Sequence, residues 1–77
     1  MAKKQQYQLT DLLKTSGWVM VETGRFITLE KNGWRIAIGA NSTTLYNCDN
    51  PSNLHIFQTH QLDLIIRKIK ELKLWAV

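Results

Sequence analysis

The sequence predicts an α+β fold. We expect an antiparallel meander sheet of three to five strands, with an N-terminal and a C-terminal helix packed on one face. Leucines recur at helical spacing near the start of the chain, and isoleucines do so near its end. Between them, apolar and polar residues alternate, and Asn32-Gly33 gives a strong hairpin signal because a type I′ turn needs positive φ at both positions. The 77 residues fit a single domain, residues 1–77.

The first helix is expected from about Gln6 to Ser16. Gly17 follows it and suits the left-handed position that ends many helices. Alternatively, Thr10 caps a shorter helix that begins at Asp11. The residues that share the predicted buried face are Leu9, Leu12, Leu13 and Ser16.

Two tight turns set the predicted strand registers. A tip at Asn32-Gly33 pairs Lys31 with Trp34, Glu30 with Arg35, Leu29 with Ile36 and Ile27 with Ile38. A tip at Thr23-Gly24 pairs Glu22 with Arg25, Met20 with Ile27 and Trp18 with Leu29. Both registers bury the same face. A slip of one residue at either turn would scatter the apolar set of that face, which favours these registers. That set is Trp18, Met20, Ile27, Leu29, Trp34, Ile36 and Ile38.

The opposite face of these strands is mixed in character. It is polar where Glu30 meets Arg35, and apolar near Val21 and Phe26. Its members are Val19, Val21, Phe26, Thr28, Glu30, Arg35 and Ala37.

The second half of the chain is expected to add strands and a closing helix. Residues 43–48 form a fourth strand with Leu45 toward the core and Tyr46 away from it, and residues 54–58 are a fifth strand or merely extended. The helix runs from about His60 to Lys73, with Thr59 as its cap. Asp63 lies in or near its first turn and pairs with Arg67 four residues later. Its apolar stripe is Leu62, Ile65, Ile66, Ile69, Leu72 and Ala76.

Residue sets that catalysis requires are missing from the sequence. It has no glycine-rich phosphate loop and no G-x-S-x-G motif, and its six acidic residues are widely spread. Cys48, His55 and His60 are the only candidates for soft metal ligands or for a Cys–His pair, and they lack the paired spacing of zinc sites. We therefore predict no enzyme activity, no catalytic residues, no metal, no cofactor and no small-molecule substrate.

The cellular setting follows from simple counts. A lone cysteine allows no internal disulfide, and the first residues show a positive end with no apolar stretch after it. No apolar run approaches the ~20 residues that span a bilayer. A cytoplasmic protein without membrane contact is expected.

Basic residues offer one candidate surface. The net charge is +4, and several cations lie in the last helix and near the chain start. Such a set can contact phosphates, although cations near a helix C-terminus also suit the helix dipole. The candidate nucleic-acid-binding residues are Lys3, Lys4, Arg67, Lys68, Lys70 and Lys73.

Trp75 points to a different surface. It falls outside the apolar stripe of the last helix and lines up with Leu64 on one flank. The end of the sequence is apolar, so either it folds back over the sheet or it contacts another chain, which we favour. The predicted protein interface consists of Leu64, Lys68, Glu71 and Trp75.

Two segments give the chain a resemblance to a known family. Residues 12–19 (LLKTSGWV), followed by a hairpin and the closing helix 62–70 (LDLIIRKIK), resemble the HicA toxins over about residues 9–30 and 59–73. The resemblance implies a small α-β-β-β-α domain of the double-stranded-RNA-binding type that cleaves mRNA. The family's catalytic histidine follows a Gly-Ser pair early in the meander, whereas this chain has Gly24-Arg25-Phe26 there. The resemblance therefore favours a non-catalytic relative.

The leading functional prediction is a small, non-enzymatic adaptor, inhibitor or other regulator that binds a macromolecular partner, either another protein or a second copy of itself, and forms a homodimer. A phage or mobile-element origin would suit such a protein. The alternative is an RNA- or DNA-binding module that uses the basic C-terminal helix. A third hypothesis is a toxin-like ribonuclease relative, for which His55 and His60 would be the only acid–base candidates.

Overall fold

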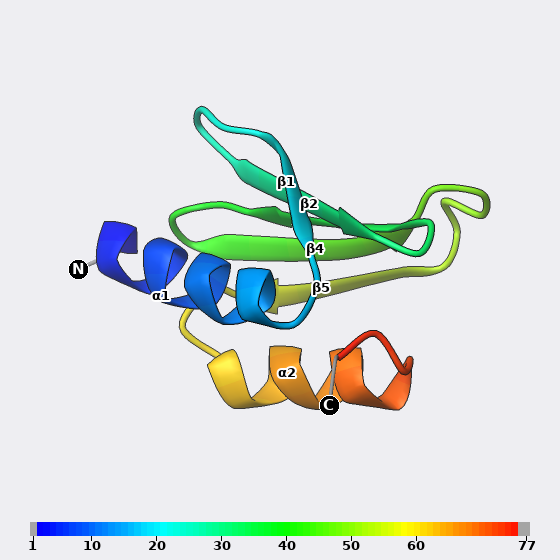
Figure 1. The fold of residues 1–77 in the computed structure, drawn as a ribbon. Helices are drawn as coiled ribbons and strands as arrows, with labels where there is room; N and C mark the ends of the chain where they lie inside the picture. The colour runs from blue at the N-terminus through cyan, green and yellow to red at the C-terminus, as the bar shows by residue number, and fades with distance from the viewer. Residues whose placement is uncertain (1, 76–77) are drawn as a thin grey trace.

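The computed structural model describes residues 2–75, with side chains from Gln6 onward, and has an α+β architecture. Two helices flank an antiparallel meander in the predicted order (Figure 1). The sheet has five strands in the spatial order β1-β2-β3-β4-β5, so each strand pairs with its neighbour in sequence. The elements are α1 (Ala2–Thr15), β1 (Val19–Glu22), β2 (Ile27–Lys31), β3 (Trp34–Ile38), β4 (Ser42–Asn47), β5 (Leu54–Gln58) and α2 (Leu62–Glu71).

Helix α1 is longer than predicted at its start and ends as expected. Gly17 has φ +91°, the left-handed conformation predicted for the helix end. The alternative cap at Thr10 is wrong, because Thr10 lies inside α1 and its hydroxyl donates to the carbonyl of Gln6 at 2.8 Å. The end of α1 is tied to the sheet by Lys31, whose Nζ donates to the Ser16 carbonyl at 2.6 Å.

The hairpin between β2 and β3 has the predicted register. Lys31 lies opposite Trp34, Glu30 opposite Arg35, Leu29 opposite Ile36 and Ile27 opposite Ile38. Asn32 has φ +49° and Gly33 has φ +83°, as the turn requires.

The predicted register of the first hairpin is wrong, by two residues at Met20 and by three at Glu22. Met20 lies opposite Leu29 rather than Ile27, and the ladder shifts between Met20 and Glu22, which leaves Val21 in an irregularity. The connection is therefore longer than a two-residue turn at Thr23-Gly24. A shift of two residues preserves the alternation of faces, so the buried set is unchanged.

The core lies between the sheet and both helices, which occupy the same side of the sheet (Figure 1). Every member of the predicted buried face contributes, with Met20 and Trp34 only partly buried. Leu45 of β4 is also buried there, as predicted. The helices add Leu9 and Leu13 from α1 and Ile65 and Ile69 from α2. Residues 54–58 do form a strand.

Helix α2 begins later and ends earlier than predicted. Thr59 is not its cap, because the cap position is Gln61 and makes no side-chain capping bond. Thr59 is instead buried, and its hydroxyl donates to the Gly39 carbonyl at 2.7 Å and lies 2.9 Å from the Thr43 hydroxyl. This buried network outweighs the local preference of threonine for a helix start. No helix in the described part of the chain is long and apolar enough to cross a membrane.

The chain turns back directly after α2. Lys73 has φ +60°, and Leu74 is buried in the core. The indole nitrogen of Trp18 donates to the Leu74 carbonyl at 3.1 Å, which joins the start of β1 to the end of the described chain. Of the two alternatives for this segment, the described part folds back onto the domain. Ala76, the last residue of the predicted stripe, lies outside the described residues.

Candidate protein-binding surface

The face of the sheet away from the helices carries a continuous row of side chains. Antiparallel pairing places Val19, Glu30, Arg35, Tyr46 and Leu54 side by side across all five strands. Cross-strand neighbours on one face of a sheet lie close enough to interact. We call this surface the open face, and its second row contains Thr28, Ala37, Thr44 and Ile56.

Exposed apolar side chains gather on the open face. Among described residues, seven large hydrophobic residues are exposed, and all but Tyr7 and Leu64 belong to it. The two most exposed, Ile56 at 67% and Val19 at 64%, lie at opposite edges of the sheet. The other three are Val21, Phe26 and Leu54. These residues form two groups on either side of a polar centre, and exposed apolar residues collected on one face are a mark of interaction sites.

The centre of the open face is polar but electrically balanced. Arg35 Nη2 lies 3.6 Å from a carboxylate oxygen of Glu30. A hydrogen bond to Tyr46, and then the charge of Glu30, raise the pKa of Arg35, so the guanidinium stays protonated. Tyrosine and arginine are enriched at protein interfaces, because they combine contact area with directed hydrogen bonds.

Phe26 closes one end of the open face. A Cβ atom on Gly39 would lie 2.6 Å from the Phe26 ring and 2.8 Å from the Ser42 carbonyl, so this position has no room for a side chain. The missing side chain lets the ring approach the backbone of the neighbouring turn. Phe26 thus packs against the Gly39 backbone although almost half of its surface is exposed.

The structure keeps Leu64, Lys68 and Glu71 of the predicted protein interface in α2 but places Trp75 beyond the helix. Leu64 is exposed on α2, and Lys68 forms an ion pair with Glu71 at 3.7 Å. Trp75 is not on the helix, which ends at Glu71. It packs against the core, and its ring centroid lies 5.7 Å from Lys70 Nζ. The predicted helical alignment of Trp75 with Leu64 is therefore wrong. An interface at these four residues stays a prediction.

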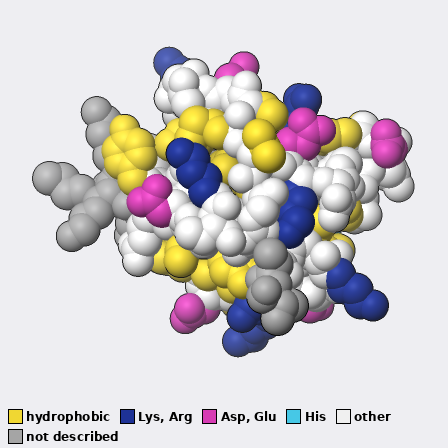
Figure 2. All heavy atoms as spheres, in the orientation of Figure 1, with side chains coloured by type: hydrophobic (Ala, Val, Ile, Leu, Met, Phe, Trp, Pro, Cys, Tyr) yellow, Lys and Arg dark blue, Asp and Glu magenta, His cyan; other side chains and the backbone are white. Residues whose placement is uncertain are grey.

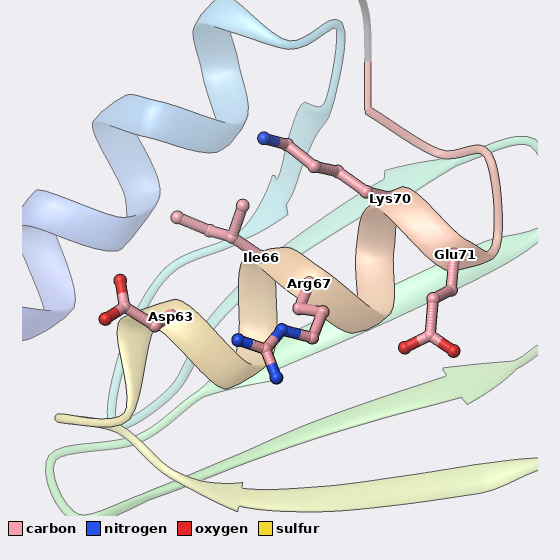
Figure 3. Close-up of a pocket in the computed structure, with 5 residues that line it drawn as sticks. All are labelled: Asp63, Ile66, Arg67, Lys70 and Glu71. Carbon is pink, nitrogen blue, oxygen red and sulfur yellow. The ribbon is translucent and has the colours of Figure 1, made fainter.

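The predicted nucleic-acid-binding residues share their surface with acidic side chains. Arg67 and Lys70 line a shallow hollow along α2 together with Asp63 and Glu71 (Figure 3). Figure 2 shows both charge signs along the lower rim of the molecule, where α2 lies. Asp63 and Arg67 do not form the predicted ion pair among the described side chains. Lys3 and Lys4 lie in α1, and their side chains are outside the described set.

The soft-ligand candidates do not converge. Cys48 is exposed just after β4, and His60 is exposed in the loop before α2. His55 is half-buried on the helix side of β5, where its ring stacks on Trp34 with centroids 6.4 Å apart. The described residues contain no group of three histidine, cysteine or acidic residues able to hold a metal ion.

The predictions from sequence missed the contribution of β5 to the open face. Leu54 and Ile56 face outward because Leu45, which is buried, pairs with His55 between them. The alternation of residues 54–57 could have indicated which side chains face outward. Apolar residues occupy both even and odd positions there, so the sequence could not assign the two faces. The chain matches no protein-family model, no curated protein and no solved structure. The resemblance to the HicA family stays a prediction.

Proposed function

We propose that this chain is a non-enzymatic interaction protein that binds a protein partner through the open face. The observation that carries the proposal is the placement of five of the seven exposed large hydrophobic residues on this one surface. The opposite face of the sheet is occupied by the protein's own helices, so it is not available to a partner.

The chemistry of the open face indicates the kind of partner. Val19, Leu54 and Ile56 offer apolar contacts, while Glu30 and Arg35 balance each other's charge. A complementary surface is then mainly apolar and carries hydrogen-bonding groups opposite Arg35 and Tyr46. A nucleic acid would instead require a positive surface to neutralise its phosphates. The mixed charges along α2 give that alternative less support.

Site-specific photocrosslinking in cells that make the protein tests the proposal. A benzophenone side chain replaces Tyr46 on the open face, Leu64 on α2 or Tyr7 on α1 in three separate variants. We expect one defined protein to be crosslinked from position 46 and none from position 7, although position 7 is more open to solvent. The crosslink should disappear when Val19→Asp and Ile56→Asp place charges on the apolar parts of the face.

Other outcomes would contradict the proposal. A defined crosslink from position 64 alone would move the interface to the helix flank predicted from the sequence. Equal labelling from all three positions would mean that no surface is specific. Anisotropy titrations with duplex RNA and DNA at two salt concentrations provide a separate check, since salt-dependent binding would favour the nucleic-acid alternative.

A further inference from the structure

Strand β5 is an edge of the sheet, and its outward backbone groups are unequally available. Within β5, His55 and Phe57 direct their backbone groups toward β4, because Asn53 and Thr59 on either side bond to Asn47 and Asn41 of the β4 segment. The alternate residues Leu54, Ile56 and Gln58 therefore direct theirs away from the sheet.

One end of this edge is already occupied by the protein itself. The Gln58 N–H donates to Gln61 Oε1 at 3.0 Å, and the Gln61 N–H donates to the Gln58 carbonyl at 2.9 Å. In the described part of the chain, the outward N–H and C=O groups of Leu54 and Ile56 have no partner. The open stretch of the edge therefore consists of the outward backbone groups of Leu54 and Ile56. It ends at Gln58, whose outward groups are already hydrogen bonded to Gln61.

We propose that a second copy of this chain pairs with the β5 edge in antiparallel orientation about a two-fold axis at His55. In this register Leu54 faces Ile56 of the second copy, and Ile56 faces its Leu54. Each of these two residue pairs exchanges two hydrogen bonds, which satisfies every open group and leaves the Gln58 contacts undisturbed. An axis at Ile56 would instead pair Leu54 with Gln58, whose groups are already bonded.

The same pairing rearranges the open face. In one copy, the most exposed aliphatic residues lie at the edges of the sheet, whereas binding energy at interfaces is concentrated near the centre. Pairing along β5 places Leu54 and Ile56 from both copies together in the middle of a double-width sheet. This consequence extends the proposed function, but the self-association rests on the strand edge alone and is tested without any partner.

Backbone amide exchange and sedimentation of the purified full chain test the pairing. We expect the Leu54 and Ile56 amides to become protected as concentration rises, while the Gln58 amide, which is bonded within the chain, does not change. A contact this small is expected to be weak, so concentrations up to about 1 mM are needed. A chain that stays monomeric over this range would overturn the proposal, and so would protection confined to β1.

The substitution Ile56→Pro tests the proposed pairing directly. Proline removes an N–H that the β4 ladder does not use, and edge strands tolerate it at such positions. Two hydrogen bonds are lost per dimer, so association should weaken roughly thirtyfold. Gln58→Pro is the control, because its N–H lies outside the proposed pairing, and circular dichroism shows whether both variants keep their fold. Equal weakening by both variants, or by neither, would overturn the assignment.

Discussion

The two edges of the sheet are built differently. β1 has four residues, and its ladder with β2 shifts between Met20 and Glu22. β5 pairs five consecutive residues with β4 without a break, and it contains no proline, lysine or glutamate. Natural sheets protect their edge strands against pairing with other chains by shortening the strands, introducing bulges or adding charged residues. The β1 edge carries two of these protections, a short strand and a break in its ladder, whereas the β5 edge carries none of them.

The edges also differ in what anchors them. β1 follows directly on Trp18, a buried core residue that is hydrogen bonded to Leu74. The anchor of β5 lies at its far end, where Thr59 is buried and bonds to Gly39. Substitutions at these anchors and at the exposed strand positions therefore separate stability from association.

The largest expected effect is at Trp18. Trp18→Ala should lower the free energy of unfolding by about 3–5 kcal/mol, because it leaves a large cavity under the start of β1. Trp18→Phe keeps most of the ring and loses chiefly the hydrogen bond to Leu74, so about 1–2 kcal/mol is expected. Urea denaturation monitored by circular dichroism measures both. An alanine variant no less stable than the phenylalanine variant would show that the packing is not what anchors this edge.

A smaller effect is expected at Thr59. Thr59→Val keeps the volume but leaves the Gly39 carbonyl without its buried donor, which should cost about 1–3 kcal/mol. Thr15→Val is the control, since the Thr15 hydroxyl makes a hydrogen bond of the same length, 2.7 Å, to Leu12 in an exposed position. Equal losses of stability in the two variants would show that burial does not set the strength of the Thr59 anchor.

The smallest effects compare the exposed strand positions directly. Val19→Thr and Ile56→Thr both retain a β-branched side chain, and each should change stability by less than about 0.5 kcal/mol. Only Ile56→Thr should weaken self-association, by about threefold to tenfold, because it alone removes cross-strand contacts in the paired sheet. Sedimentation at several concentrations measures this difference. A similar weakening by Val19→Thr would mean that the β1 edge takes part.

Local turn chemistry explains why one hairpin was predictable and the other was not. Asn32-Gly33 satisfies both positions of its turn, so the pairing of Lys31 with Trp34 followed from the sequence. In Thr23-Gly24 the first position is a β-branched threonine, which does not favour the positive φ that Asn32 adopts in its turn. The longer connection seen in the structure brings Phe26 over Gly39. That contact joins residues from two separate turns, so no short segment of sequence reveals it.

The candidate surfaces show the same limit. The helical pattern placed Trp75 beside Leu64 because no glycine or proline in the sequence marks the helix end at Glu71. The positive φ of Lys73 redirects the chain there, and burial of Leu74 accompanies the change. The open face depended on the orientation of Leu54 and Ile56, which β4 fixes through pairing of His55 with Leu45.

In the pairing that we propose for β5, the irregularity at Val21 limits assembly to two copies. Subunits with two unprotected edge strands would add to one another without end and form continuous sheets, which is the route to fibres. With only one unprotected edge strand per subunit, assembly stops at a closed dimer, because two-fold pairing uses that edge in both copies. Under the proposed pairing, the break in the β1 ladder thus makes a pair of chains the largest assembly that strand pairing can build.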